Sequence, residues 1–324
     1  MKSMRNIVIT LAIFCLMVAG LNAQVVRNDA IKAYNEGVAA KDTDFPAAIK
    51  AFEKAIEIAG QVGAEADDIK QNAMKIVPSL YVKIANKAVT DKAPAADILR
   101  LSKAAAAVAA KYDNQTAKEN SGKLMIQGYN AMANDLFSKN DYANVLLTFD
   151  SILAVNPNYN NAIFNKALAY SKMNDNGNFE STIDLYIEKM KSVNDTVKIA
   201  KASKMALEYF RQAGSKANQG NKLTDAVTLL DKAAKYGNDK DVFYYYADAY
   251  NKQKNFDKGL EFAQKGLDLE TGTPEAKAKF YYQLGVAQEG KGMKDDACTS
   301  FKNSMFGPFT DASKAHRTNL KCAD

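Results

Sequence analysis

The sequence contains no tryptophan, one histidine and three cysteines among its 324 residues. Because His316 is the only histidine, a metal site built on several histidines is excluded, and no serine triad or cysteine–histidine pair stands out. We expect His316, which lies between Lys314 and Arg317, to be an ordinary surface residue. The glycine–lysine pairs lack the upstream glycine spacing of a phosphate-binding loop. The sequence therefore predicts no enzyme, no cofactor and no metal site.

Proline and glycine are also scarce, with 6 and 17 residues, which favours long regular elements over a loop-rich fold. Alanine, lysine and leucine, which are good helix formers, are abundant in the middle of the chain. Hydrophobic residues make up 47%, enough for a substantial core, so the chain is not disordered. Acidic and basic residues are interspersed and no basic run occurs, which argues against nucleic acid as the main partner.

The first 23 residues have the features of a signal peptide. Lys2 and Arg5 precede an apolar run, Ile7–Gly20, that is short for a membrane span, and a small residue, Ala23, ends the segment. Removing the segment lowers the formal charge from +6 to +4. We expect an exported protein of a Gram-negative bacterial envelope, periplasmic or secreted, with no transmembrane segment after cleavage. The alternative is that the segment is kept as a membrane anchor.

Two cysteines remain after this cleavage, and both lie near the C-terminus, at Cys298 and Cys322. In an oxidising compartment, two closely spaced cysteines suggest a disulfide bond. The alternative interpretation is a pair of buried free thiols.

Internal repetition is visible along the rest of the chain. In residues 279–304, apolar and small residues recur at helical spacing on both sides of a turn at residues 290–294. The residues of this unit are Tyr281, Leu284, Gly285 and Gln288 before the turn and Ala297, Phe301 and Ser304 after it. The same frame recurs upstream, clearly at residues 129–157, 163–186, 210–233 and 243–266 and less regularly at 30–59 and 81–104.

These units resemble the tetratricopeptide repeat (TPR), a pair of helices in which small residues allow close approach and large residues fill the space between neighbouring pairs. The resemblance implies an all-α, right-handed superhelical solenoid of about seven repeats over residues 24–324. The repeats are degenerate in residues 24–113 and clearer in 114–309, and residues 310–324 form a capping helix. A coiled coil is disfavoured because the apolar positions do not keep a seven-residue period.

Helix-breaking residues refine this frame. Prolines are tolerated in a first helical turn, and three lie where helices should begin: Pro46, Pro94 and Pro274. Pro78 falls inside an apparent helix at residues 69–89, so we expect a kink or break there. We also expect a longer loop at residues 60–68 and an extended turn at residues 174–178.

The resemblance implies a protein or peptide partner bound in the inner groove of the solenoid, through apolar anchors and main-chain hydrogen bonds. The chain is then a non-enzymatic scaffold of unidentified partner. Carried over to this sequence, the inward-facing positions of the first helices are Asn130, Asn134, Phe137, Phe164, Leu168, Arg211, Ser215, Asn218, Tyr244, Asp248, Asn251 and Tyr282.

One subclass of the family grips a partner's C-terminal carboxylate with lysine, asparagine and arginine. Asn134 and Asn165 match its two asparagine positions, but Asn130, Glu208 and Gln212 stand where it has cations. We therefore predict no carboxylate clamp.

Adjacent tyrosines raise an alternative function, a periplasmic or surface protein that binds glycans or other solutes. The tyrosines are Tyr244, Tyr245 and Tyr246, and Tyr281 and Tyr282. The absence of tryptophan weakens this hypothesis, and within each run only one or two rings can face the groove.

Two short segments, Asp150-Ser151-Ile152 and Asp195-Thr196-Val197, resemble a bacterial O-glycosylation signal. Matches of three residues also arise by chance, so the sequence alone does not decide whether either segment is glycosylated.

Overall fold

The structure, a computed structural model, describes residues 27–323, so the expected signal peptide lies outside the described residues. Every regular element in this range is helical. An unlabelled helix at residues 27–40 is followed by α2 (Phe45–Val62), η1 (Ala64–Ala66), α3 (Asp67–Thr90), α4 (Ala95–Lys111), α5 (Gln115–Ser138), α6 (Tyr142–Val155), α7 (Asn160–Lys172), α8 (Asn176–Ser192), α9 (Thr196–Gln219), α10 (Leu223–Ala234), α11 (Lys240–Lys252), α12 (Phe256–Leu269), α13 (Pro274–Gly290), α14 (Lys294–Asn303), η2 (Gly307–Phe309) and α15 (Thr310–Leu320).

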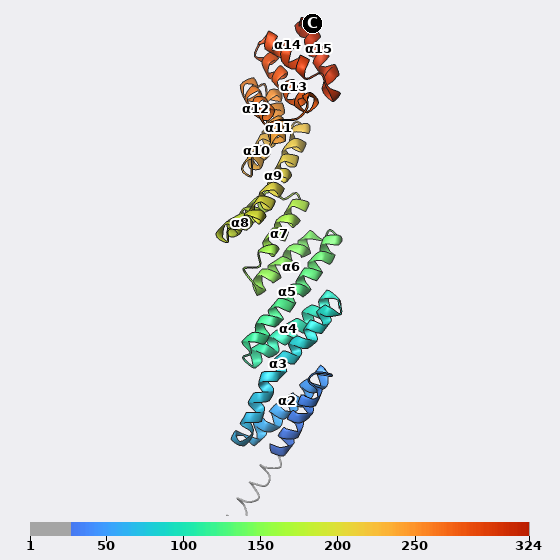
Figure 1. The fold of residues 1–324 in the computed structure, drawn as a ribbon, viewed down its shortest axis with the longest axis vertical. Coiled ribbons are helices and arrows are strands. Elements are labelled where there is room, and N and C mark those ends of the chain that lie inside the picture. The colour runs from blue at the N-terminus through green and yellow to red at the C-terminus, as the bar shows by residue number, and fades with distance from the viewer. Residues whose placement is uncertain (1–26, 324) are drawn as a thin grey trace, which may run out of the picture. The chain divides into compact units, whose positions relative to one another are not determined.

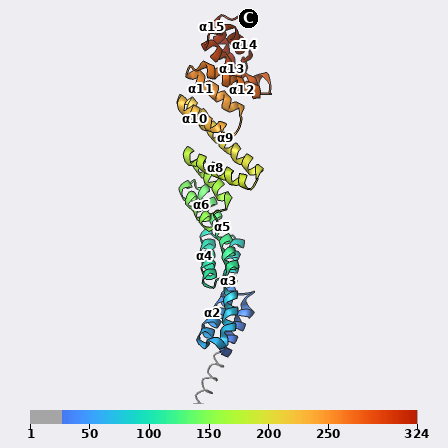
Figure 2. The ribbon, with the colours of Figure 1, turned by 90° about the vertical axis from the view of Figure 1, so that its left-hand side faces the viewer.

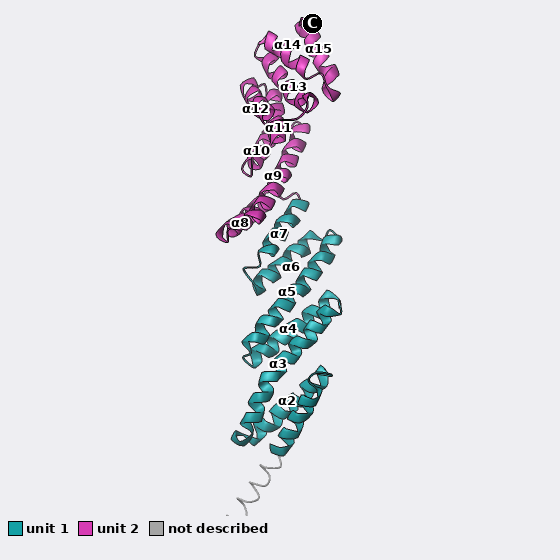
Figure 3. Ribbon diagram, viewed as in Figure 1, with its two compact units in different colours: residues 1–173 teal, residues 174–324 magenta. Residues whose placement is uncertain are grey.

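The described residues form two compact units that meet in the sequence between Met173 and Asn174 (Figure 3), called unit 1 and unit 2. Within each unit, every labelled α-helix packs against the next one in the sequence (Figures 1 and 2). Unit 1 holds the pairs 27–40/α2, α3/α4 and α5/α6, and unit 2 holds α9/α10, α11/α12 and α13/α14. The repeat predicted at residues 163–186 corresponds to α7 and α8, which belong to different units.

Small residues on first helices face large residues on their partners, as the repeat frame predicts. A Cβ atom added to Gly37 would lie 2.9 Å from the Phe52 ring, and one on Gly285 would lie 2.8 Å from Phe301. Both phenylalanines are completely buried. Close approach of the two helices therefore depends on the missing side chain, and the all-α TPR-like fold predicted from the sequence is confirmed.

The same short turn joins many consecutive helices. One residue adopts the left-handed conformation, as at Asn140 and Asn194, with φ of 57° and 55°. The next residue, Asp141 or Asp195, caps the following helix by accepting a hydrogen bond from the backbone N–H three residues on. Asparagine tolerates the left-handed region and aspartate is a strong N-cap, so the sequence Asn-Asp specifies the turn locally.

Two expected loops are absent, and of the kink or break expected at Pro78 the break does not occur. α3 continues without a break through Pro78, and the expected loop at residues 60–68 is reduced to Gly63, with φ of 83°, between α2 and η1. The expected extended turn at residues 174–178 is also absent, because Asp175 caps α8 and the helix begins at the next residue. Pro46, Pro94 and Pro274 stand at helix starts as predicted.

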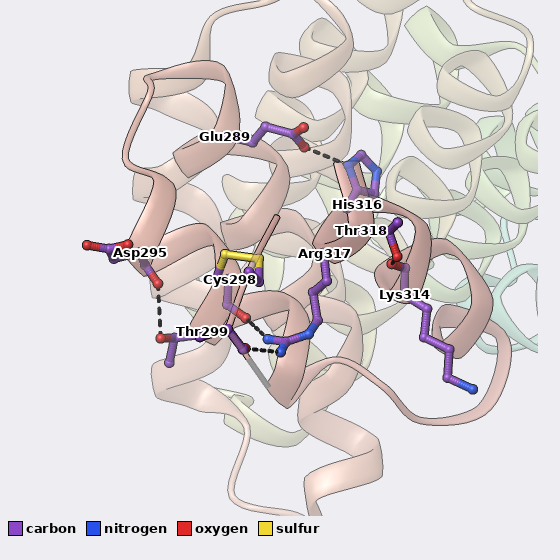
Figure 4. Close-up of a disulfide and its surroundings, with 10 residues drawn as sticks. Glu289, Asp295, Cys298, Thr299, Lys314, His316, Arg317 and Thr318 are labelled. Carbon is purple, nitrogen blue, oxygen red and sulfur yellow. Dashed lines mark hydrogen bonds and ion pairs between the residues drawn. A yellow bond between two sulfur atoms is a disulfide. The ribbon is translucent and has the colours of Figure 1, made fainter. Parts of the chain in front are cut away.

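The last helix, α15, packs on α14 at the end of unit 2 (Figure 4). His316 is half-buried there, with its ring stacked on Phe301 at 4.4 Å and its Nδ1 2.6 Å from Glu289 Oε2. The expectation of an ordinary surface histidine is therefore wrong. The sulfur atoms of Cys298 and Cys322 are bonded, so the segment that follows α15 is tied covalently to α14.

Candidate partner-binding surface

In unit 1 the predicted groove residues differ in their exposure and in their hydrogen-bond partners. Asn134 is exposed and its side chain makes no hydrogen bond to another described residue, whereas Asn130 donates to the Tyr159 hydroxyl at 3.1 Å. Phe164 and Leu168 on α7 are half-buried. Phe137 packs against the ring of Phe149 in the core beside α6, so it anchors the repeat rather than a partner.

A pocket of about 350 Å³ lies upstream of these positions, where α3 and α5 pack side by side. Its lining combines apolar groups with amides and two lysines, and consists of Val82, Lys83, Asn86, Asn120, Lys123, Leu124 and Gln127. We call it the α3/α5 pocket. Its three amide side chains are exposed and make no hydrogen bonds within the part of the chain that the structure describes. Lys83 is engaged by Asp42 at 3.2 Å.

The α3/α5 pocket and two predicted groove residues lie on one face of α5. Lys123, Gln127, Asn130 and Asn134 are separated by three or four residues, which places them in a row along a helix. The sequence frame missed the first part of this row because it began the helix near Tyr129, whereas α5 begins at Gln115. The sequence did carry a signal for the longer row, because amide residues recur every seven positions, at 120, 127 and 134.

In unit 2 several predicted groove residues bind one another across the first helices. Asn218 on α9 donates to Asp248 Oδ2 on α11 at 2.7 Å, and Lys252 donates to the same carboxylate oxygen at 2.7 Å. Gln283 on α13 donates to Asp248 Oδ1 at 3.2 Å. Asn251 completes the network by donating to Gln283 Oε1 at 2.9 Å. Most of these polar groups have partners inside the unit, with the buried Asn251 Oδ1 as the exception, so we assign the side chains to stabilising the unit.

Arg211 is held in a second set of contacts between α9 and the start of α11. Its Nη1 lies 2.8 Å from Asp239 Oδ2 and 3.6 Å from Asp241 Oδ2. Asp241 is in turn paired with Lys279 of α13. The guanidinium of Arg211 is therefore largely neutralised within the unit.

Arg211 and the predicted groove residue Ser215 border a pocket of about 510 Å³. Gln212, Lys216, Gln219, Asp241 and Tyr245 complete its lining. Only 8% of Ser215 is exposed, so this residue contributes little contact area. The lining consists mainly of charged and amide residues, and the half-buried ring of Tyr245 is its one aromatic group.

The tyrosines do not form a flat platform for sugars. Tyr244 packs edge-on against Tyr245 and Phe280, and burial, followed by the charge of Asp248, raises its pKa to about 12. Tyr282 packs against Phe309 at 5.3 Å, and burial also raises its pKa. Ring faces that pack against neighbouring side chains are less available to stack on a sugar, so the glycan hypothesis is not favoured.

Among residues 27–323, no group of three or more histidine, cysteine or acidic side chains is placed to hold a metal ion. No helix in that range combines the length and apolar character needed to cross a membrane.

A scan against protein-family models finds no match for this chain, and neither does a search of the curated proteins. Solved structures with similarity include a crystal structure of MamA protein, at 20% identity over 61% of this chain and 97% of that one, with a TM-score of 0.32. A tetratricopeptide repeat protein from Parabacteroides merdae shares 13% identity over 91% of this chain and 99% of its own, with a TM-score of 0.29. The APC/C hetero-tetramer Cut9–Hcn1 shares 11% identity over 90% and 69%, with a TM-score of 0.32. At such low scores these likenesses do not indicate what this chain binds.

Proposed function

We propose that this chain is a non-enzymatic protein-binding scaffold of the bacterial cell envelope, and that it binds an extended segment of a partner protein along α3 and α5 of unit 1. The observation that carries the proposal is the α3/α5 pocket, where exposed amides without internal partners surround the half-buried side chain of Val82, above the buried Leu124.

This combination suits a peptide main chain. An extended peptide presents N–H and C=O groups that need partners, and an asparagine or glutamine side chain both donates and accepts hydrogen bonds. Each such bond contributes about 0.5–1.5 kcal/mol, while the half-buried Val82 provides a surface on which a partner's apolar side chain is removed from water. Asn134 would extend the row of amides along α5.

The setting of two tyrosines with raised pKa values favours a scaffold over an enzyme. Burial raises the pKa of Tyr236 and of Tyr246 above the ordinary value for tyrosine. The hydrogen bond from Tyr236 to Asp184 and that from Tyr246 to Asp231 raise these pKa values further. Both tyrosines hold neighbouring helices of unit 2 together and do not line the α3/α5 pocket. Titratable groups with shifted pKa values usually mark an active site when they lie in a cleft.

Export is supported by the signal-like first 23 residues and by the bond between Cys298 and Cys322. Disulfides persist in oxidising compartments and are rare in the reducing cytosol.

The test uses the chain from residue 24 onward, immobilised and exposed to an envelope extract of its own host. A variant with Asn120→Asp and Gln127→Glu changes hydrogen-bond donors of the pocket to acceptors with almost no change in shape. A control variant with Gln61→Glu and Asn72→Asp makes the same chemical changes at exposed positions outside the pocket lining. A photo-crosslinking residue at position 86 then reports contact directly.

We expect a protein that binds the native chain and the control variant, binds the pocket variant at least tenfold more weakly, and crosslinks to position 86. Equal binding to all three chains would contradict the proposed surface, and the absence of any retained protein would contradict the scaffold function.

A further inference from the structure

The two segments that resemble an O-glycosylation signal have opposite structural settings. In Asp150-Ser151-Ile152, the Ile152 side chain is completely buried in α6, and Ser151 Oγ donates to the Leu147 carbonyl at 3.0 Å. Ser151 itself is half-buried, but an enzyme could contact Ile152 only by unfolding the helix. Ile152 is therefore explained by its place in the core, and residues 150–152 match the signal without presenting it on the surface.

Asp195-Thr196-Val197 lies instead at the turn between α8 and α9. Thr196 is exposed, and its hydroxyl makes no hydrogen bond within residues 27–323. Val197 is 77% exposed, and Val193 on the other side of the turn is 62% exposed. Thr196 and Val197, together with Val193 before the segment, are thus exposed on the folded protein, and Asp195 is half-buried at the helix cap.

Asp195 is fixed in place by two interactions. It caps α9 by accepting the Lys198 backbone N–H at 3.0 Å, and its carboxylate lies 2.8 Å from Lys198 Nζ. The acidic group and the Thr196 hydroxyl therefore have a defined relative position on the surface before any enzyme binds.

We propose that Thr196 is an O-glycosylation site and that Ser151 is not. The inference rests on the proposed export, because it assigns the modification to the envelope form of the chain. A third segment, Asp42-Thr43-Asp44, is exposed but has an acidic residue in place of the aliphatic one, so it remains unmodified and serves as an internal control.

The reaction needs a glycosyl donor with a diphosphate leaving group and a transferase, both supplied by the cell. Thr196 Oγ1 attacks the anomeric carbon of the donor and forms the new C–O bond. The bond from that carbon to the diphosphate oxygen breaks and its electron pair leaves with the diphosphate, while the threonine proton passes to a base on the transferase. A bulky, polar glycan at this position would cover Val193 and Val197, which are the two most exposed large aliphatic side chains near the turn.

The direct test is mass spectrometry of the full chain purified from the envelope of its own host. Trypsin releases Thr196 in the peptide of residues 192–198, Thr43 in residues 42–50 and Ser151 in residues 140–166. We expect a sugar mass on the first peptide only, and electron-transfer fragmentation should place it on Thr196 rather than on Ser192. An unmodified 192–198 peptide, or a glycan on Ser192 or Ser151, would overturn the inference.

Three variants separate recognition of the segment from folding. Thr196→Ala removes the acceptor, Asp195→Ser keeps an N-cap but removes the acidic group, and Val197→Asp recreates the pattern of residues 42–44. We expect each to lose the glycan and keep the thermal midpoint of an unglycosylated chain. The matched control is Asp141→Ser, which changes the equivalent cap of α6 and should leave Thr196 glycosylated. Retention of the glycan in Asp195→Ser would show that the segment is not what the transferase recognises.

Cell fractionation distinguishes this inference from the proposed function. A processed chain in the envelope without a glycan overturns the glycosylation site alone. An unprocessed chain kept in the cytoplasm without a glycan overturns both the site and the proposed export.

Discussion

Asn251 of α11 occupies the space that a side chain at residue 259 of α12 would need. A Cβ atom added to Gly259 would lie 1.9 Å from Asn251 Oδ1, far inside van der Waals contact. The Asn251 amide cannot move away freely, because its Nδ2 donates to the backbone and side-chain oxygens of Gln283 at 3.0 and 2.9 Å. The glycine therefore allows the buried polar network of unit 2 to form.

We expect Gly259→Ala to destabilise the protein. Overpacking costs about 1–3 kcal/mol, which exceeds the gain of about 1 kcal/mol from the better helix propensity of alanine. Urea unfolding followed by circular dichroism measures the difference. Gly60→Ala is the matched control, because no atom lies within 4 Å of its added Cβ, and it should be neutral or stabilising. Equal effects of the two changes would show that Asn251 can move aside.

Asp239 should contribute more to stability than an ordinary surface carboxylate. Its Oδ1 caps α11 by accepting the backbone N–H groups of Asp241 and Val242 at 2.9 Å, and its Oδ2 binds Arg211. We expect Asp239→Ala to cost about 2 kcal/mol, most of it from the lost cap. Asp239→Asn keeps a capping oxygen and should cost less than half as much. Thermal unfolding of both variants tests this order, and an equal loss in the two would show that the ion pair dominates.

Stability should fall in alkaline solution partly through Tyr244. Its pKa in the folded protein is about 12, above the ordinary value of about 10 that applies to the unfolded chain. Between these pH values the folded protein keeps the phenolic proton and the unfolded chain loses it, so the free energy of unfolding decreases as the pH rises. Urea unfolding at several pH values should give a shallower decrease for Tyr244→Phe between pH 10 and 12. Parallel curves for the two proteins would contradict a buried, protonated Tyr244.

Reduction of the disulfide should loosen the end of unit 2. The bond between Cys298 and Cys322 closes a loop of 24 residues, for which the entropy of the unfolded chain predicts about 3 kcal/mol of stabilisation. We expect Cys298→Ser with Cys322→Ser to increase amide hydrogen exchange in α15 and to leave exchange in unit 1 unchanged. A reducing agent should reproduce the effect in the native chain and have none on the variant. Unchanged protection of α15 would mean that the contacts of His316 and Phe301 suffice to hold it.

Much of the fold was readable from short stretches of sequence, because each helix pair packs mainly on its neighbours. The small and large positions of the repeat frame pair Gly285 with Phe301, and these two residues do pack together. The errors at residues 60–68 and 174–178 arose from treating polar and glycine-rich stretches as loops, although the Asn-Asp turn signal at Asn174 and Asp175 marks the start of α8. Pro78 shows the limit of a local rule, since packing of α3 against both α2 and α4 keeps the helix continuous.

The candidate site was less predictable. By itself, the sequence determined that the chain forms helix pairs and which helix faces carry polar residues, since both follow from spacing within one helix. Only the tertiary structure decided which of those polar groups find partners inside the protein. Asn218 and Asp248 are 30 residues apart and bind each other, whereas Asn120 and Gln127 keep their amides exposed on α5. A hydrogen bond between neighbouring repeats depends on how the two helices are offset and rotated, and no periodicity within one helix specifies that geometry.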